Sequence, residues 1–305
     1  MTTITSSSRI TRVGIVARAD LHSAARVLDD LAEWLHARGL VALFDEATAK
    51  LSARQHQVLA SNALVGAVDL IVLLGGDGTL LATADRLAMA GGSIPILGVN
   101  FGSLGFLTEI TLPELYDALD TAINGQAPIE ERLMLHAQIV EDGQVVEDVR
   151  VLNDVVVTRG ALSRMTDLSI SVNDQFIARF KADGMIVATA TGSTAYNLSA
   201  GGPIVHPGVD ALVVTPIAPH TLTNRPVVVP ASWTLVIQPL ADAGRQDVYV
   251  TFDGQLGHPL PVDRSVRIKR AEQPLRLVRP TTRSYFDVLR QKLKWAEDSR
   301  RSGGV

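Results

Sequence analysis

Three glycines surround one carboxylate in the segment GGDGT, residues 75–79, which follows the most apolar run of the chain. Glycine lets the backbone approach a phosphate closely, and a helix that begins beyond the loop would offer free N–H groups to an anion. A carboxylate here repels a bare phosphate, so Asp77 needs another role, such as accepting a hydroxyl proton or meeting a phosphate-bound metal. A tight turn in which Asp77 caps the helix is the structural alternative. The phosphate loop predicted in this way consists of Gly75, Gly76, Gly78 and Thr79.

A second glycine-rich segment, GVNFGSLGFL at residues 98–107, follows the next apolar run. Two successive strands that end in such loops would place both loops side by side. Taken alone, this segment fits an ordinary turn and a phosphate site equally well. The sequence contains no GxxxxGK followed by Ser or Thr, and no GxGxxG, so the P-loop and Rossmann motifs are excluded.

Hydroxyl groups, one aromatic ring and small residues gather in the segment TGSTAYNLSAGGP, residues 191–203. Ser and Thr hydroxyls can bind purine edges and ribose, and Tyr196 could lie against a base. A binding site is favoured over a plain loop, although the same residue types also form loops readily.

Polar residues also interrupt two strand-like runs. Asn153 and Asp154 stand within a series of β-branched residues, where they are either exposed on an edge or hydrogen-bonded to a buried group. Asp253 and Gly254, followed by Gln255, suit either a hairpin or a ligand contact.

The first 130 residues alternate short apolar runs with helical patterns, which predicts a parallel, doubly wound sheet that binds ligands at the carboxyl ends of its strands. Strands are expected at 13–17, 40–44, 68–74 and 94–99, and helices at 27–39, 53–64, 80–90 and 111–125. The last of these helices begins with a capping box, Thr111 and Glu114, and has Pro113 in its first turn.

After about residue 132 the apolar pattern changes to a period of two, which predicts a mostly β second domain. Strand-like runs lie at 133–140, 145–157, 168–172, 176–180, 211–215, 233–238, 247–252, 264–270 and 274–278. A final helix at 283–295 would place Phe286, Leu289 and Leu293 on one face and could dock on the first domain. Twelve Lys or Arg against four acids between 264 and 301 are interpreted mainly as a solvated face, with attraction of an anionic substrate as the alternative.

The composition limits the function further. The chain has 305 residues, 47% hydrophobic but only 5% aromatic, as expected for two domains whose cores contain mainly aliphatic residues. A net charge of −4 argues against nucleic acid or a membrane as partner. The chain lacks cysteine, the seven His have no ligand spacing, and no apolar signal segment or membrane span is evident. These features predict a cytoplasmic protein.

Together these blocks resemble bacterial NAD kinases. The resemblance rests on LGGDGTLL (74–81), LGVNFGSLGFLTE (97–109), LNDVVV (152–157), KADGMIVATATGSTAYNLSAGGPI (181–204), TPIAPHTLTNRPVVVP (215–230) and FDGQ (252–255). Diacylglycerol and sphingosine kinases have a similar GGDGT, and phosphofructokinases share its GGDG core, whereas the block at 181–204 is highly specific. Many relatives have Arg where this chain has Phe101, so a cation near the phosphates must come from elsewhere.

The resemblance implies the NAD kinase/diacylglycerol kinase-like fold, with an α/β N-terminal domain that contains a parallel sheet, a β-rich C-terminal domain, and NAD between them. The implied boundaries are 1–130 for the nucleotide-binding domain, joined by the helix in 281–305, and 131–280 for the NAD-binding domain. Asp77 resembles the base that accepts the proton of the adenosine 2′-hydroxyl. The NAD-binding residues implied are Asp77, Gly78, Asn153, Asp154, Arg164, Lys181, Asp183, Thr194, Ala195, Tyr196, Asn197, Leu198, Ser199, Ala218 and Gln255.

The implied reaction is phosphoryl transfer from ATP, another nucleoside triphosphate or polyphosphate to NAD, giving NADP. A divalent cation, Mg²⁺, would be carried by the donor phosphates, with no metal held by the protein alone. The resemblance also implies a homodimer or homotetramer. A lipid kinase and a dinucleotide-sensing module without catalysis are the alternative functions.

Overall fold

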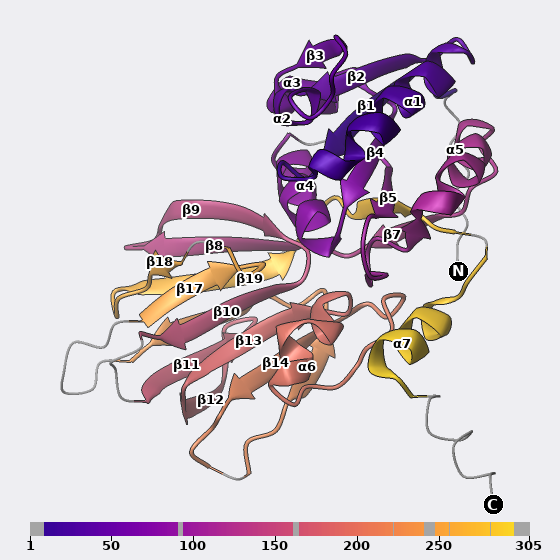
Figure 1. Cartoon of the computed structure of the whole chain (residues 1–305). Helices are drawn as coiled ribbons and strands as arrows, with labels where there is room; N and C mark the ends of the chain where they lie inside the picture. Colours follow the sequence, from indigo (N-terminus) through magenta and orange to yellow (C-terminus); the bar gives the residue numbers. More distant parts are fainter. Residues whose placement is uncertain are drawn as a thin grey trace, which may run out of the picture. The chain divides into compact units, whose positions relative to one another are not determined.

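The chain, here a computed structural model, is described for residues 9–90, 94–160, 165–221, 223–240, 248–255, 257–280 and 282–295. It divides into two compact units (Figure 1). Unit 1 comprises the described residues up to Glu131 and from Arg276 onwards, and unit 2 comprises Arg132–Leu275.

Unit 1 contains a mostly parallel sheet with the strand order β3-β2-β1-β4-β5-β20-β7, in which β6 also pairs with β5. The strands are β1 (Arg12–Ala17), β2 (Val41–Asp45), β3 (Gln57–Leu59), β4 (Leu70–Gly75), β5 (Ile96–Asn100), β6 (Ile110–Thr111), β7 (Ile129–Arg132) and β20 (Leu275–Val278). The helices are η1 (His22–Ala24), α1 (Ala25–His36), α2 (Glu46–Ala49), α3 (Ser61–Ala67), α4 (Asp77–Met89), η2 (Leu112–Glu114), α5 (Leu115–Ile123) and α7 (Tyr285–Leu293).

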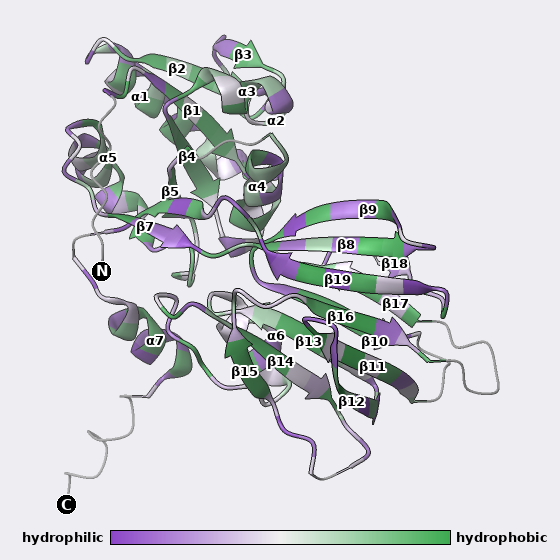
Figure 2. Cartoon of the chain, turned by 180° about the vertical axis from the view of Figure 1, so that it is seen from behind, coloured by the Kyte–Doolittle hydropathy of each residue, from purple (hydrophilic) through white to green (hydrophobic). Residues whose placement is uncertain are grey.

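The apolar run before the GGDGT loop forms the centre of this sheet. All six residues of β4 are buried, as a strand with both faces covered requires. Figure 2 colours this strand mostly as hydrophobic. Helix α1 buries Leu28, Leu31 and Leu35, spaced three and four residues apart, so one helical stripe packs on the sheet. The capping box of Thr111 and Glu114 is present and confirms the predicted helix start.

Three expectations for unit 1 are wrong. The helix predicted at 53–64 is absent, because residues 57–59 pair with β2 as strand β3 and the helix α3 begins only at Ser61. Helix α4 begins at Asp77, inside the glycine loop, and not near residue 80. The run 274–278, grouped with the β-rich domain, pairs in parallel with β5 through Leu277 and Ile96, so β20 belongs to the sheet of unit 1.

Unit 2 is a sandwich of two antiparallel sheets, ordered β15-β14-β13-β10-β17-β18 and β12-β11-β16-β19-β8-β9. Both sheets contribute to one apolar core, with Val155 and Val187 from the first and Leu135, Ile170 and Ile237 from the second. The strands are β8 (Leu135–Glu141), β9 (Gln144–Val151), β10 (Asp154–Arg159), β11 (Thr166–Val172), β12 (Gln175–Ala182), β13 (Gly184–Thr189), β14 (Ala211–Ile217), β15 (Val227–Pro230), β16 (Leu235–Pro239), β17 (Val248–Phe252), β18 (His258–Pro259) and β19 (Arg264–Arg270), with the short helices η3 (Gly192–Thr194) and α6 (Tyr196–Ser199).

The single strand predicted at 145–157 is two strands in the structure. Strand β9 ends at Val151 and β10 begins at Asp154, and the two strands lie in different sheets. Leu152 and Asn153 make the crossing. The polar pair Asn153 and Asp154 therefore marks the point at which the chain changes sheets.

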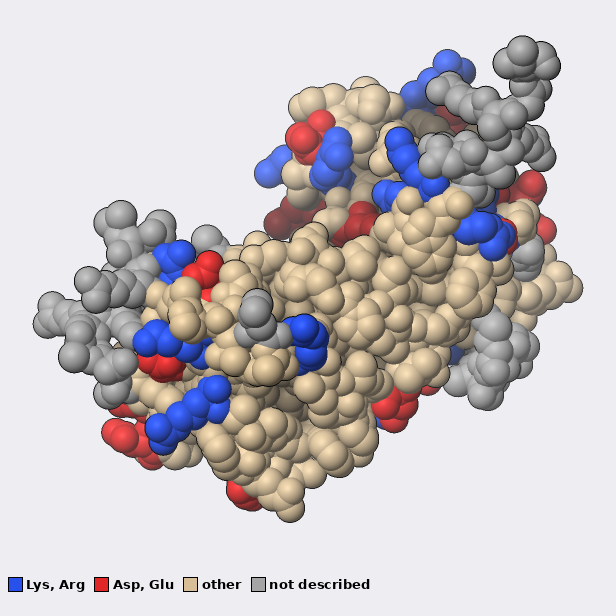
Figure 3. All heavy atoms as spheres, turned by 90° about the horizontal axis from the view of Figure 1, so that it is seen from below, with Lys and Arg blue, Asp and Glu red and all other residues tan. Residues whose placement is uncertain are grey.

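The final helix is only partly buried, and the surface carries charges of both signs. In α7 the buried residues are Val288 and Leu289, whereas Phe286 is 56% exposed, so the predicted apolar face is only partly correct. On the face drawn in Figure 3, Lys and Arg lie next to Asp and Glu and do not form a single basic field. Among the described helices, none combines the length and apolarity needed to cross a membrane.

Candidate functional site

The two glycine-rich loops lie side by side in unit 1. Strands β4 and β5 are parallel neighbours, with Gly75 opposite Asn100 at their carboxyl ends. The backbone N–H of Phe101 donates to the carbonyl oxygen of Gly75 at 3.1 Å. The predicted juxtaposition of the two loops is confirmed.

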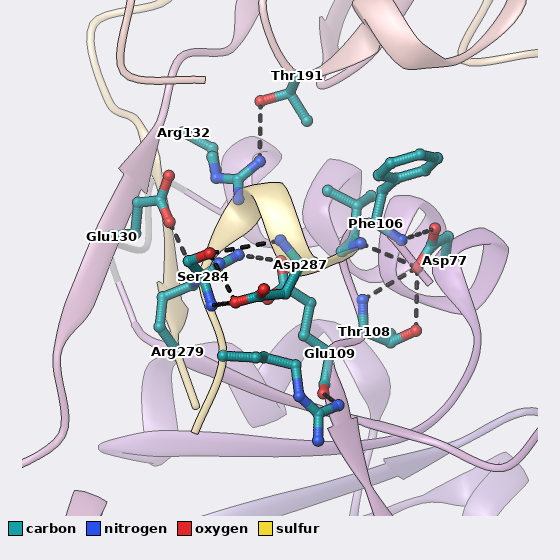
Figure 4. Close-up of polar contacts among 12 residues, drawn as sticks. Asp77, Phe106, Thr108, Glu109, Glu130, Arg132, Thr191, Arg279, Ser284 and Asp287 are labelled. Carbon is teal, nitrogen blue, oxygen red and sulfur yellow. Dashed lines mark hydrogen bonds and ion pairs between the residues drawn. The ribbon is translucent and has the colours of Figure 1, made fainter. Parts of the chain in front are cut away.

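Asp77 connects the two loops through its side chain (Figure 4). Its Oδ1 accepts hydrogen bonds from the backbone N–H of Leu107 (3.1 Å), from the N–H of Thr108 (3.0 Å) and from the Thr108 hydroxyl (2.9 Å). Its Oδ2 accepts one, from the N–H of Phe106 at 2.8 Å. Asp77 is the first residue of α4 after the N-cap Gly76, and its carboxylate binds another segment instead of capping its own helix. The capping alternative is therefore wrong.

The four hydrogen bonds fix the Asp77 carboxylate and still leave it able to accept a further hydrogen bond. Four donors on one short segment hold the group in a single orientation. A Cβ added at Gly105 would lie 2.0 Å from Oδ1, so only glycine permits this close approach. Since Oδ2 accepts one of these hydrogen bonds and Oδ1 three, Oδ2 is the oxygen with room for a further donor, such as a substrate hydroxyl.

The glycines before and after Asp77 face open space. A Cβ at Gly76 or Gly78 would meet no atom within 4 Å, whereas one at Gly75 would lie 2.6 Å from the Thr79 hydroxyl oxygen. Packing within the chain therefore explains Gly75 but not Gly76 or Gly78. Their small size leaves the start of α4 accessible to a ligand, as a phosphate at a helix N-terminus requires.

A cleft of about 540 Å³ opens beside this loop within unit 1. Two cations contribute to it, Arg18 from the end of β1 and Arg86 from α4, the latter 3.7 Å from the carboxylate of Asp45. Together with the start of α4, they favour an anion. The lining residues are Val16, Ala17, Arg18, Ala19, Asp45, Ala47, Gly76, Gly78, Thr79, Ala82 and Arg86.

In unit 2, Asp253 holds the crossing between β9 and β10. It has φ +50 and accepts hydrogen bonds from the N–H groups of Leu152 (2.8 Å), Asn153 (2.7 Å) and Asp154 (3.1 Å). The Asp154 side chain is buried beside it. Burial first, and then the negative charge of Asp253, raise the pKa of Asp154 from 3.8 to about 7.

The loop 191–203 is held together by its buried polar residues. Asn197 donates to the carbonyls of Ser193 (2.9 Å) and Pro203 (3.1 Å) and accepts from the Thr215 hydroxyl at 2.6 Å. A Cβ at Gly202 would lie 2.0 Å from Asn197 Oδ1, and one at Gly192 would lie 2.0 Å from the carbonyl oxygen of Asn153. The second contact joins this loop to the crossing between β9 and β10.

Comparison with known proteins identifies the family. Residues 13–127 match the family model for the ATP-NAD kinase N-terminal domain, and residues 152–280 match that for the ATP-NAD kinase C-terminal domain. The chain belongs to the NAD kinase family. Members of this family are phosphotransferases.

Individual relatives of the NAD kinase family are similar over nearly the whole chain. The NAD kinase of Geotalea daltonii is 45% identical over 286 residues, and that of Geobacter sp. (strain M21) is 48% identical over 288 residues; each match covers 94% of this chain and 99% of the relative. Yeast NADH kinase, solved in complex with NADH, has a TM-score of 0.86 at 25% identity, covering 97% of this chain and 91% of that one. An NAD kinase from Archaeoglobus fulgidus, solved in complex with ATP, has a TM-score of 0.72 at 25% identity and covers 93% and 99%. The NAD kinase fold predicted from the sequence is confirmed.

The other residues implied by the resemblance to NAD kinases differ in accessibility. Tyr196 and Ser199 are exposed on α6, and Lys181 and Gln255 are also exposed, so their side chains can reach a ligand. Asn197 is buried, and its side chain supports the loop. Their roles in binding the dinucleotide stay predictions.

A second group of these residues has contacts of its own. Asp183 forms an ion pair with Arg159 at 2.8 Å, and the Thr194 hydroxyl donates to the carbonyl of Thr191 at 3.3 Å. Ala218 has φ +43, a left-handed conformation that is uncommon for alanine. Ala195 and Leu198 are half-buried, and Arg164 lies outside the described residues. Among the described residues, no group of three or more His, Asp or Glu could hold a metal ion.

Sequence reasoning missed the residues that hold Asp77. Thr108 is fully buried, and its hydroxyl accepts a hydrogen bond from Asn100 Nδ2 at 3.0 Å while it donates to Asp77. The available signal was the placement of two polar residues, Thr108 and Glu109, in the otherwise apolar stretch between Phe106 and Ile110. Arg279, assigned to a solvated face, is only 8% exposed.

Proposed function

We propose that this chain transfers the terminal phosphoryl group of ATP, another nucleoside triphosphate or polyphosphate to the 2′-hydroxyl of the adenosine ribose of NAD, giving NADP. The observation that carries the proposal is the Asp77 carboxylate, held by four donors beside a helix start that faces open space. Unit 1 is then the nucleotide-binding domain and unit 2 the NAD-binding domain.

Asp77 acts as the general base. The ribose oxygen forms a bond to the terminal phosphorus of the donor, and its proton passes to Asp77 Oδ2. The bond from phosphorus to the bridging oxygen breaks, and the electron pair leaves with the nucleoside diphosphate. An alcohol is a poor nucleophile at neutral pH, and a positioned base is typically worth about 10² to 10⁴-fold in rate.

The donor phosphates bind in the cleft of unit 1. Gly76, Gly78 and Thr79 line this cleft at the start of α4, and Arg18 and Arg86 offset the charge of the phosphates. These two arginines supply the cations that Phe101 does not. A divalent cation such as Mg²⁺ would be carried by the donor phosphates and would offset part of their charge. No residue of the chain is assigned to the metal.

The dinucleotide contacts residues of unit 2. Asn153 and Asp154 bind its ribose hydroxyls, and α6 supports the adenine end, with Tyr196 against the base and Ser199 as a hydrogen-bonding partner. A pKa near 7 lets Asp154 donate or accept a hydrogen bond at neutral pH. Asp183, Ala218, Lys181 and Gln255 complete the contacts.

A coupled assay tests the function. The purified chain, given Mg²⁺-ATP and NAD, is expected to form NADP and ADP in equal amounts; parallel reactions with NADH and with polyphosphate define the acceptor and the donor. A sensing module would bind NAD in calorimetry but form neither product. A lipid kinase would sediment with vesicles and phosphorylate a lipid alcohol, and either result would exclude the proposal.

The proposed enzyme is cytoplasmic and works as a homodimer or homotetramer, as the resemblance implies. Light scattering during size-exclusion chromatography of the untagged chain gives the oligomeric state, and a monomeric mass at micromolar concentration contradicts this part of the proposal.

A further inference from the structure

A C-terminal segment of unit 1, residues 279–292, contacts the loop that holds Asp77. The loop runs from Gly105 to Glu109, and three of its residues donate hydrogen bonds to the Asp77 carboxylate. The loop and the segment are about 170 residues apart in the sequence. The contacts between them go beyond the pairing of β20 with β5, which already fixes the segment to the sheet.

The side chain of Glu109 forms the first contact. Glu109 directly follows Thr108 and is 2% exposed, and its carboxylate forms an ion pair with Arg279. Arg279 is 8% exposed, and its Nε lies 3.1 Å from Glu130 Oε2 on β7. Buried charges are costly unless they are paired, so this pairing specifies where residue 109 lies.

The main chain of the same residue forms the second contact. Arg283 donates from one guanidinium nitrogen to the carbonyl oxygen of Glu109 at 2.8 Å and from another to Glu114 Oε1 at 2.5 Å. Glu114 Oε2 in turn accepts from the N–H and the hydroxyl of Thr111, at 2.9 and 2.7 Å. Arg283 thus connects the end of the loop to the capping box of the following helix.

A third contact lies at the other end of the loop. The amino group of Lys292, on α7, lies 5.9 Å from the centre of the Phe106 ring. Phe106 is the residue whose N–H donates to Asp77 Oδ2, the oxygen assigned to the hydroxyl proton. The segment therefore contacts both ends of the run 106–109, whose intervening backbone carries the donors to Asp77.

We propose that Arg279 and Arg283 are positioning residues for the phosphoryl-transfer step, which hold residues 105–109 and, through them, the carboxylate of Asp77. The proposal rests on the assignment of Asp77 as base. Neither arginine touches a reacting atom. Their loss misplaces the base without removing a substrate contact, so it lowers kcat and leaves KM nearly unchanged, since a small misplacement of a catalytic group is costly.

Arg283→Ala is the principal variant, because Arg283 is less buried than Arg279. Its partner Glu114 is partly exposed, so the variant does not leave a fully buried carboxylate without a cation. We expect kcat to fall by about tenfold or more, with KM for NAD and for ATP within about twofold of the wild type. Arg283→Lys, which can replace one of the two hydrogen bonds at a time, is expected to restore part of the rate. Arg290→Ala is the matched control, since Arg290 lies on the same segment and, within the described part of the chain, forms its ion pair with the exposed Asp287.

A double-mutant cycle with Asp77→Asn separates positioning from a general loss of structure. If Arg283 acts through Asp77, Arg283→Ala lowers kcat in the wild type but causes no further loss in the Asp77→Asn chain. Equal losses in both backgrounds, or a rise in KM with kcat unchanged, overturn the inference. Undiminished activity of Asp77→Asn overturns instead the assignment of the base, so the two failures are distinguishable.

Folding is controlled in the same series. Each variant is assayed at least about 15 degrees below its own melting temperature, which is about four to seven times the shift in melting temperature expected from 1 kcal/mol in a chain of this size. Should Arg283→Ala fail to fold, Arg283→Lys takes its place in the cycle, because it keeps the charge and removes one of the two hydrogen bonds that Arg283 makes at the same time. A lower kcat only in the presence of the Asp77 carboxylate supports the inference, and an unchanged kcat contradicts it.

Discussion

Asp77 and Asp253 have an environment opposite to that of Asp154. Asp77 is held by three backbone N–H groups and a hydroxyl, and Asp253 by three backbone N–H groups. Asp154, by contrast, is buried next to the negative charge of Asp253, and its pKa rises to about 7. The carboxylates of Asp77 and Asp253 are fixed in place, whereas the protonation of Asp154 depends on pH in the physiological range.

The raised pKa of Asp154 predicts a defined pH dependence of stability. The folded chain binds this proton more tightly than the unfolded chain, so the contribution is fully present below about pH 4 and is lost as the pH rises through about 7. Asp154→Asn removes this loss. Relative to the wild type, the variant should gain on the order of 1 to 4 kcal/mol in free energy of unfolding between pH 4 and pH 8.

Urea denaturation at pH 4, 6 and 8 measures this difference. Asp148→Asn is the control with the opposite sign: burial would raise the pKa of Asp148, but hydrogen bonds from Gln138, His136 and Arg150 outweigh it and lower the pKa to about 2. Its contribution is present above about pH 4 and is lost as the pH falls through 2, so Asp148→Asn should destabilise the chain at pH 8. If the effect of Asp154→Asn on the free energy of unfolding did not change with pH, the pKa of Asp154 would not be raised in the folded chain.

At the scale of elements, the junction between β4 and α4 carries the site. The strand is buried on both faces, the loop approaches its neighbour through Gly105, and the helix begins with its N-cap Gly76 facing open space. Glycines in this region therefore have two different roles. Gly105 is needed by the fold itself, and Gly76 and Gly78 are needed only if a ligand approaches.

Gly78→Ala and Gly105→Ala distinguish these roles. A Cβ at Gly78 meets nothing within 4 Å, and alanine is the better helix former, so we expect the free energy of unfolding to stay the same or rise by about 0.5 to 1 kcal/mol. The KM for ATP should nevertheless increase at least about tenfold, because the methyl group occupies the space of a phosphate. Steady-state kinetics and urea denaturation give the two numbers.

Gly105→Ala should behave in the opposite way. The new methyl group would lie 2.0 Å from Asp77 Oδ1, so the variant is expected to lose about 1 to 3 kcal/mol of stability together with most of its turnover. A Gly78→Ala enzyme with an unchanged KM for ATP would contradict the placement of the donor phosphates at this helix start.

The elements also show what the sequence can predict. Local signals were sufficient for β4, for the two glycine loops and for the capping box at Thr111, because each depends on neighbouring residues. The elements that were predicted wrongly depend instead on pairing with strands that are distant in the sequence. Residues 57–59 are a strand only because β2 lies beside them, and β20 belongs to unit 1 only because β5 accepts it as a neighbour.

The same limit applies to the site. The sequence placed Asp77 in a phosphate loop, but nothing local to Arg279 or Arg283 indicates that they contact a residue about 170 positions earlier. From the balance of charges between residues 264 and 301, we interpreted both arginines as part of a solvated face. Asn197 is the opposite case. Its motif suggested a ligand contact, whereas its side chain makes hydrogen bonds to Ser193, Pro203 and Thr215 that hold the loop.

For the whole molecule, the family and the chemistry agree. Matches to both NAD kinase domains cover residues 13–127 and 152–280, and the bacterial relatives align over 94% of the chain. The blocks that carry the resemblance include Asp77, Asp154 and Asp253. The central claim is that one of them, Asp77, accepts the proton of the acceptor hydroxyl.

The most direct test of this claim is the turnover of Asp77→Asn, measured as NADP formation at saturating NAD and Mg²⁺-ATP. We expect kcat to fall by about 10² to 10⁴-fold, with the dissociation constant for NAD in calorimetry within about threefold of the wild type. Asn places an amide N–H opposite the N–H of Phe106, so a control that keeps the carboxylate is needed. Thr108→Val removes one of the four hydrogen bonds to the carboxylate, together with the hydrogen bond from Asn100, and should lose less than about tenfold in turnover. Turnover of Asp77→Asn near that of the wild type would contradict the account.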